Sequence, residues 1–487
     1  MLFNSYIFVL LFLPVSLAGW FWLNKCKSQL PSNLFLVVMS LWFYGYFNPE
    51  YLWILGSSIV GNYLIAKVLS RECLKTGVRK AVLTAGIVVN GSSIFYFKYF
   101  DFFLSNVNGL FGQDFMLLHV VLPLGISFFT FQQISFLVDS YRGETKEYGF
   151  VEYALFVSFF PQLVAGPIVL HKEMIPQFRQ EQNRHFKGEN LSKGLYIFAR
   201  GLFKKVLIAD TFGVAVTAGF DMVPYLSSME AILVSVAYTL QLYFDFSGYC
   251  DMAIGIGYMF NIQLPQNFHS PYKAVSIIDF WDRWHMSLTR FLREYIYFPL
   301  GGSRGGKLKT YRNIMIVYLV SGIWHGANWT FVLWGILHGV LNCLNRAGKK
   351  YWDKLFVGLR WLITFCVVNL LWVFFRAESV SQAFVFLTRM FGGYGFNVGK
   401  WLTECFDLVE VVFIERALGI YYRLMEMIPE VHMIVFFMIA FVAVLFGKNS
   451  SEVRFKPTLV RGLGTILMLV WSIISFTGVS VFLYFNF

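Results

Sequence analysis

Apolar stretches long enough to cross a lipid bilayer recur along the whole chain, and no other feature of the sequence limits its fold so strongly. They include Leu2–Leu23, Asn33–Ala66 (a close pair), Ala81–Phe97, Val120–Val138, Ala231–Ile262, Leu359–Phe375, His432–Phe446 and Leu463–Phe485. A helix needs about 20 apolar residues to span a hydrocarbon layer of about 30 Å. We therefore predict an all-α, multi-pass protein of the plasma or inner membrane with about eleven spans.

Composition supports this class and removes others. Hydrophobic residues make up 57% of the 487 residues and charged residues only 14%, which is outside the range of ordinary soluble domains. Leu2–Leu23 lacks the charge order and cleavage site of a secretory signal peptide, so we expect it to remain as the first span. The six cysteines are scattered with no C-x-x-C pair, and they indicate neither a disulfide framework nor a metal site.

The net charge of +12 is concentrated between the apolar stretches rather than in a nucleic-acid-binding face. Lysines and arginines gather at Lys67–Lys80, Lys172–Lys205, Lys273–Arg312, Arg346–Arg360 and Lys448–Arg461. By the positive-inside rule these segments are predicted to be cytoplasmic and the N-terminus to be outside. Asn313–Asn345 contains no charged residue and has basic segments on both sides, so it is predicted to be a hairpin or re-entrant pair with His325 near its turn.

We predict one membrane domain over 1–487, with N-terminal helices at 1–149, a catalytic core at 150–345 and C-terminal helices at 346–487. The core mixes apolar runs with polar residues, as in "LQLYFDFSGYCDMAIGIG" (Leu240–Gly257). Irregular backbone and charge at membrane depth are tolerated only where protein or a water-filled cavity surrounds them. The core is therefore predicted to hold re-entrant and interfacial helices around a central tunnel.

A second histidine is placed by periodicity. From Ser276 to Phe298 an apolar stripe at helical spacing is formed by Ile278, Trp281, His285, Leu288, Leu292 and Tyr295. This predicts one amphipathic helix on which Asp282, three residues before His285, is near enough to orient or charge the ring.

Each ionisable residue in this core also has a purely structural interpretation. Either His285 or His325 alone could bridge helices, but two such residues separated by a basic, Gly-rich loop favour chemistry. His338 has almost entirely apolar neighbours, and we favour a structural hydrogen bond for it. Asp245 either lines the cavity or serves as a helix N-cap or as the ion-pair partner of a nearby arginine.

Five stretches resemble the membrane-bound O-acyltransferase family, in particular its bacterial, alginate O-acetyltransferase-like branch. They are "FFPQLVAGPI" (Phe159–Ile168), "QLYFDFSGYCDMAIGIG" (Gln241–Gly257), "PQNFHSPY" (Pro265–Tyr272), "FWDRWHMSLTRFLREYIYFPLGGSR" (Phe280–Arg304) and "SGIWHGANWTFVLWGILHG" (Ser321–Gly339). The resemblance implies funnels from both membrane faces that meet near a catalytic histidine. The family histidines carry over to His325 and His285, and substrate contacts are expected from Gln162, Asp245, Ser247, Asn267, Trp281, Arg283 and Trp324.

The resemblance also implies a reaction. An acyl group, expected to be acetyl, would pass from a cytoplasmic thioester across the membrane to O-acetylate an extracellular or cell-wall polysaccharide. His325 is expected to be the general base, with an acyl-histidine as the weaker alternative, because histidine titrates nearest neutrality. His285 would assist as a second proton handler, or would hold the donor or the oxyanion.

We expect no bound cofactor or metal, because acyl-coenzyme A or an acylated carrier protein would be a donor substrate. Expected partners are the lipid bilayer and an exported, membrane-anchored acetyltransferase-like or hydrolase-like protein, with no nucleic acid. Two alternatives stay open. One is D-alanyl transfer from a carrier protein toward teichoic acid, and the other is a non-enzymatic transporter, although no internal repeat supports it.

Overall fold

The computed structural model describes residues 1–71, 73–145, 147–421, 425, 427–453, 455–476 and 482–483. Every regular element within those ranges is helical, which confirms the all-α prediction. The chain forms two compact units, one of residues 1–202, 249–266 and 455–487 and the other of residues 203–248 and 267–454. We call them the first and the second unit. The single-domain division at 149 and 345 stays a prediction.

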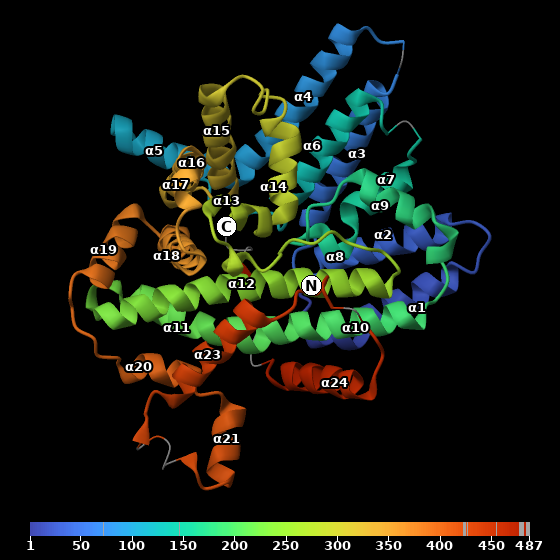
Figure 1. Ribbon diagram of the computed structural model, residues 1–487. Helices are drawn as coiled ribbons and strands as arrows, with labels where there is room; N and C mark the ends of the chain where they lie inside the picture. The colour runs from blue at the N-terminus through green and yellow to red at the C-terminus, as the bar shows by residue number, and fades with distance from the viewer. Residues whose placement is uncertain are drawn as a thin grey trace. The chain divides into compact units, whose positions relative to one another are not determined.

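The first unit is built mainly from the N-terminal helices. They are η1 (Phe8–Phe12), α1 (Leu13–Leu23), α2 (Leu30–Gly45), α3 (Tyr51–Leu69), α4 (Thr76–Ile94), η2 (Phe95–Tyr99), α5 (Phe100–Phe111), α6 (Ile126–Arg142), α7 (Phe150–Ser158), α8 (Phe160–Leu163), α9 (His171–Arg179), η3 (Glu181–Asn183) and α10 (Gly188–Phe203). The unit also holds the part of α12 (Ser228–Met259) from Tyr249 onward and the C-terminal helix α24 (Leu459–Ile474). Helices α3, α4 and α6 pack side by side (Figure 1), and α7 lies against α2 and α9.

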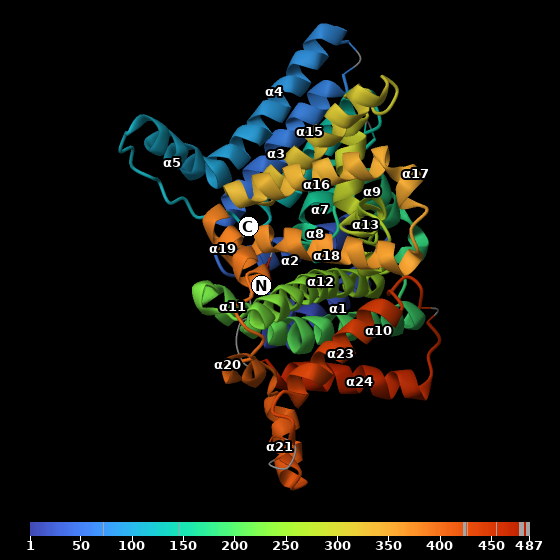
Figure 2. The ribbon, with the colours of Figure 1, turned by 60° about the vertical axis from the view of Figure 1, so that its left-hand side comes forward.

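The second unit follows α10 along the chain. It holds η4 (Lys204–Ala209), α11 (Asp210–Asp221), η5 (Val223–Tyr225), the part of α12 (Ser228–Met259) up to Gly248, η6 (Pro271–Lys273), α13 (Ile277–Arg283), α14 (Met286–Leu292), η7 (Arg293–Tyr297), α15 (Lys307–His325), α16 (Trp329–Ala347), α17 (Lys349–Trp352), α18 (Val357–Arg376), α19 (Val380–Phe391), α20 (Lys400–Thr403), η8 (Glu404–Phe406), α21 (Val409–Ala417) and α23 (Val431–Phe446). Helix α16 packs against α15, α13 and α18 (Figure 2).

The predicted hairpin over Asn313–Asn345 is confirmed as α15 and α16. The turn between them is three residues long, and Asn328 caps α16 by accepting a hydrogen bond from the Thr330 N–H at 3.0 Å. The two helices approach closely through glycines. A Cβ on Gly335 would stand 2.5 Å from the Tyr318 carbonyl oxygen, and a Cβ on Gly322 would stand 2.4 Å from that of Phe331. Small residues at such a crossing let two backbones pack directly.

Within the described residues, three helical segments are long and apolar enough to cross a membrane. These are Tyr51–Leu69, Thr76–Phe111 and Val357–Arg376, and five further apolar helices have 10 to 17 residues. The figure of about eleven spans therefore stays a prediction. Of the predicted last stretch, Leu463–Phe485, the residues beyond Phe476 other than Phe482 and Leu483 lie outside the described residues.

Candidate active site

The segment that carries His285 is not the single helix that the periodicity predicts. Helix α13 ends at Arg283, His285 has a left-handed backbone (φ 44°, ψ 52°), and α14 begins at Met286. Asn267 accounts for the break. Its backbone carbonyl accepts from the Met286 N–H at 3.0 Å and its side-chain oxygen from the Ser287 N–H at 3.1 Å, so the first N–H groups of α14 have partners outside the helix. The prediction of one continuous helix is wrong at this point.

The same side chain fixes the His285 ring. His285 is fully buried, and its Nδ1 lies 3.2 Å from Oδ1 of Asn267. Because the Ser287 N–H and O–H also donate to that oxygen, it is an acceptor, and Nδ1 of His285 must donate. The basic lone pair of the ring is then on Nε2. Asp282, predicted to orient this ring, is solvent-exposed.

His325 is the last residue of α15 and is 2% exposed. Its ring is enclosed by aromatic rings, with centroid distances of 4.9 Å to Trp324, 5.2 Å to Trp334 and 5.1 Å to Phe375. The next residue must be small, because a Cβ on Gly326 would lie 2.1 Å from the Phe331 ring. The sequence "WHG" therefore ends the helix and holds the imidazole in an apolar enclosure.

Trp324 connects the two predicted catalytic histidines. Its ring centroid is 4.9 Å from that of His325 and 6.0 Å from that of His285. Phe246, from α12, packs edge-on against the His285 ring at 4.8 Å. Both imidazoles thus border the same indole, within one cluster of the second unit.

His338, for which the sequence favours a structural hydrogen bond, has one. The Trp281 Nε1–H donates to its Nδ1 at 3.2 Å, which leaves the ring proton on Nε2. The ring is fully buried and packs against Trp334 at 4.7 Å, the indole that also contacts His325. Trp281, predicted to bind substrate, is therefore also part of the support for this histidine.

Asp245 belongs to a buried ion cluster that sequence reasoning missed. The Lys205 ammonium, 4% exposed, lies 2.6 Å from a carboxylate oxygen of Asp245 and 2.7 Å from one of Asp210. The predicted ion pair of Asp245 is present, but its partner is Lys205 and not the expected arginine, and Lys205 is not part of a solvent-exposed basic loop. A lysine five residues before an aspartate in the apolar run "KKVLIAD" was the available signal, because charges inside membrane-embedded helices occur in pairs.

The remaining predicted contact residues are spread out. The Lys204 ammonium approaches the Ser247 hydroxyl at 3.5 Å, and the Arg283 Nε–H donates to an Asp279 carboxylate oxygen at 2.6 Å. Gln162 is in α8 of the first unit, where its amide donates to the Phe156 carbonyl at 2.7 Å. The roles of all seven predicted contact residues in substrate binding stay predictions.

A cavity of about 160 Å³ opens beside this cluster in the second unit. It is bounded by α13, α14, η7, α15 and α16, and its lining includes Trp281, Ser321, Asp282, Arg293 and Arg346. The lining of the cavity therefore combines the buried indole of Trp281, which donates to His338, with the guanidinium groups of Arg293 and Arg346. An elongated ligand with an anionic end fits this combination of groups.

Comparison with known proteins identifies the family of the chain. The profile of the membrane-bound O-acyltransferase family matches residues 50–380. The peptidoglycan O-acetyltransferase of Helicobacter pylori is 43% identical over 521 residues, covering 100% of this chain and 98% of that protein. The probable alginate O-acetylase AlgI of Pseudomonas aeruginosa is 39% identical over 407 residues, covering 82% of this chain and 76% of that protein.

Relatives with a different printed activity are more distant. The teichoic acid D-alanyltransferase of Bacillus subtilis is 27% identical over 257 residues, covering 50% of this chain and 65% of that protein. The family match includes Asn267, His285, Trp324, His325 and His338, which are the residues of the buried cluster. The chain is a membrane protein and an enzyme that transfers acyl groups to oxygen, and it belongs to the membrane-bound O-acyltransferase family.

Proposed function

We propose that this enzyme supplies acetyl groups for the O-acetylation of peptidoglycan in the cell wall. One observation carries the proposal: two buried imidazoles border the same indole, in a chain that aligns along its whole length with a peptidoglycan O-acetyltransferase. The alginate acetylases cover less of the chain, and the D-alanyltransferases cover about half of it. This pattern favours acetyl over D-alanyl as the transferred group.

His325 is proposed as the general base. It takes the proton from the attacking hydroxyl, the oxygen bonds to the thioester carbonyl carbon, and the carbon–sulfur bond then breaks to release the thiolate, which takes up a proton. The aromatic enclosure of His325 supports this role, because exclusion of water protects the thioester from hydrolysis. His285, with its lone pair on Nε2, is proposed as the second group that accepts and returns a proton.

The donor is proposed to be a thioester that approaches from the cytoplasm, either acetyl-coenzyme A or an acetylated carrier protein. The cavity of about 160 Å³ is too small for a whole coenzyme A, but it suits the narrow arm that carries the thioester. Arg293 and Arg346 in its lining offer charge for phosphate groups of the donor. Trp281 and Ser321 line the same cavity, next to the histidine cluster.

The remaining proposals concern location and partner. We place the enzyme in the plasma or inner membrane with about eleven passes, in keeping with the repeated apolar stretches. The acceptor is proposed to be reached through an exported, membrane-anchored acetyltransferase-like or hydrolase-like protein that places the acetyl group on the glycan. Such a partner would keep the donor thioester on the cytoplasmic side.

The proposal is tested in a strain that lacks this chain. Peptidoglycan is purified from the deletion strain and from strains complemented with the wild type, His325→Ala or His119→Ala. Base-released acetate and O-acetylated muropeptides are then measured by mass spectrometry. His119 is solvent-exposed and lies outside the cluster, so its replacement is the matched control. Immunoblots of membrane fractions check that each variant accumulates.

We expect O-acetylation to fall to the deletion level with His325→Ala and to stay at the wild-type level with His119→Ala. A loss of about 10²- to 10⁴-fold is the range expected for removing a general base. Wild-type acetylation with His325→Ala would refute the base assignment. Loss of D-alanine esters instead of acetyl esters would move the enzyme to the alternative cargo.

A further inference from the structure

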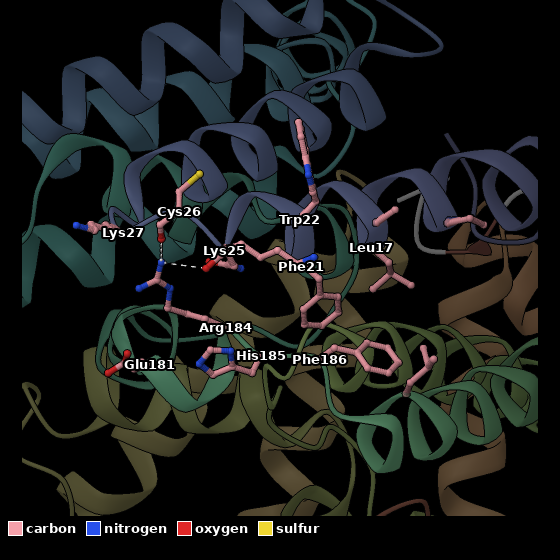
Figure 3. A pocket seen from close by; sticks show the side chains of 14 residues that line it. Leu17, Phe21, Trp22, Lys25, Cys26, Lys27, Glu181, Arg184, His185 and Phe186 are labelled. Carbon is pink, nitrogen blue, oxygen red and sulfur yellow. Dashed lines mark hydrogen bonds between the residues drawn. The ribbon is translucent and has the colours of Figure 1, made fainter.

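An amphipathic groove lies in the first unit (Figure 3). One side of the groove is formed by the end of α1 and the residues that follow it, and the other side by the chain between α9 and α10. The volume of the groove is about 910 Å³, within the range of small-molecule sites. One part is apolar and includes Leu17, Phe21, Trp22 and Phe186. The Phe21 and Phe186 rings meet edge to face at 5.5 Å and so join the two sides of the groove.

The other part of the groove is basic. Lys25, Lys27, Arg184 and His185 line it, with Glu181 as the acidic residue among the lining side chains. Lys25 and Lys27 are solvent-exposed, so their ammonium groups can move to a ligand. An apolar trough that ends in several cations matches a molecule with a hydrocarbon body and an anionic head.

Two buried polar groups in this groove point to a ligand independently of the charge. Asn24 is 5% exposed, yet neither its amide nitrogen nor its amide oxygen has a hydrogen-bond partner among the described residues. The buried Nε of Arg184 also lacks an acceptor among the described residues. The Nη2 of the same guanidinium group donates to the carbonyls of Asn24 and Cys26 at 3.2 and 2.5 Å. A buried polar group without a hydrogen-bond partner destabilises the protein, so a ligand that supplies the missing partners is favoured at both groups.

We propose that this groove binds an anionic phospholipid, with phosphatidylglycerol as the type. The phosphate would lie between Lys25, Lys27 and Arg184, the glycerol oxygens would meet the Asn24 amide, and an acyl chain would follow Leu17 and Trp22. The position of the basic residues directly after the first apolar stretch puts the groove at the cytoplasmic leaflet by the positive-inside rule. That leaflet is where the negative surface potential attracts lysines near the membrane.

The test uses the purified full-length chain in detergent micelles and native mass spectrometry. The protein is titrated separately with a short-chain phosphatidylglycerol, a phosphatidylcholine of the same chain length, glycerol 3-phosphate and coenzyme A. We expect saturable binding of phosphatidylglycerol that is about tenfold tighter than binding of phosphatidylcholine. Glycerol 3-phosphate and coenzyme A should not bind saturably, because neither fills the apolar part of the groove.

Two variants and one matched control make the assignment specific. Lys25→Gln with Lys27→Gln should weaken phosphatidylglycerol binding about tenfold, whereas Lys75→Gln with Lys80→Gln removes the same charge from another exposed basic segment and should leave binding unchanged. Asn24→Leu removes the two unsatisfied amide atoms at nearly constant volume. It should weaken lipid binding while the lipid-free protein unfolds at the same or a higher temperature.

Equal binding of phosphatidylglycerol and phosphatidylcholine would exclude an anionic lipid site. Glycerol 3-phosphate binding as tightly as the lipid would leave only a phosphate site, and tight coenzyme A binding would assign the groove to the donor. Unchanged lipid binding by the Asn24→Leu variant would also refute the proposal, because the unsatisfied amide would then have no part in recognition. None of these outcomes depends on the catalytic activity proposed above.

Discussion

One amide side chain, Asn267, organises the candidate site at the scale of single residues. Its Oδ1 receives the His285 Nδ1–H, the Ser287 N–H and the Ser287 O–H, at 3.2, 3.1 and 2.7 Å. It therefore sets the tautomer of the ring and also the start of α14. Asn267 acts through His285, so we regard it as a positioning residue.

We predict that Asn267→Ala lowers O-acetyltransferase activity about tenfold to hundredfold, because the His285 ring loses its orientation. Asn267→Asp keeps an acceptor at the same place and should restore much of this activity. Its negative charge favours the imidazolium, so the acid limb of the pH–activity profile should move to higher pH. The check is the pH–rate profile of wild type and both variants. An unshifted limb in an active Asn267→Asp enzyme would remove His285 from the proton transfers.

At this scale the sequence predicts which residues gather but not how they are held. His285 and His325 were singled out from the residues alone, because apolar surroundings make a polar side chain conspicuous. Trp324 and Asn267 were expected only as substrate contacts, in stretches that resemble the family. The left-handed backbone of His285 was not predicted, since Asn267, 18 positions earlier, imposes it. Lys205 was missed because hydropathy assigns a lysine to a loop, whereas two carboxylates allow its burial.

At the scale of secondary structure, the hairpin of α15 and α16 positions the candidate site. Its charge-free sequence between two basic segments was enough to predict it. The apolar stripe over Ser276–Phe298, by contrast, predicts a helix that the structure divides into α13, α14 and η7. Periodicity reports which side of a segment is buried, but it does not report where tertiary hydrogen bonds interrupt the backbone.

We predict that Gly335→Ala forces α15 and α16 apart and costs about 1–3 kcal/mol of stability, because the new Cβ meets backbone atoms that cannot move aside. Acetylation activity should fall by more than the loss of folded protein explains, because His325 and His338 are on opposite helices of this pair. Gly61→Ala in α3 is the matched control, because no atom lies within 4 Å of its added Cβ. Thermal unfolding and acetylation are measured for both. Equal behaviour of the two variants would show that the close approach is unimportant.

Helices α7 and α9 are joined by an ion pair that makes a pH prediction. Glu152 accepts from the Gly149 N–H at 2.9 Å and from Arg179 at 2.6 and 2.8 Å. Burial alone would raise the pKa of Glu152, but the bonds from Arg179 and Gly149 outweigh it and hold that pKa below its usual value. A lowered native pKa adds stability above the unfolded value of about 4.3, and that stability is lost as pH falls through the native pKa.

Glu152→Gln should therefore destabilise the protein at pH 7 by about 0.5 kcal/mol, a small value because solvent screens the pair. The difference from wild type should shrink as pH falls through the lowered native pKa of Glu152, and it should be absent at an acid pH below that pKa, where both side chains are uncharged. Thermal unfolding of the two proteins at the two pH values checks this. Glu50→Gln removes an exposed carboxylate and should show no difference at either pH. A constant difference at both pH values would contradict the charge-based account.

At the scale of the whole molecule, charge placement predicts which connections face the cytoplasm. Cys26 follows the first apolar stretch, and Cys73 is in the basic segment Lys67–Lys80; both are exposed. Glu404, also exposed, follows α18 and is separated from the basic segment Lys448–Arg461 by the apolar helix α23. Helix α18 begins in the basic segment Arg346–Arg360, and α23 ends next to the basic segment Lys448–Arg461, so each helix has one end in the cytoplasm by the positive-inside rule. Glu404 lies between the other ends of these helices and is predicted to be outside, whereas the two cysteines are predicted to be inside.

We predict that a membrane-impermeant maleimide labels Cys26 and Cys73 in inverted membrane vesicles but not in intact spheroplasts, when each is the single cysteine of the chain. A cysteine introduced as Glu404→Cys should show the opposite pattern. Labelling after detergent is added provides the control for reactivity in each case. Labelling of Cys26 and of the cysteine at position 404 from the same side would contradict the topology. If that side is the outer one, the basic end of the lipid groove would be at the outer leaflet, where the positive-inside argument for an anionic lipid no longer applies.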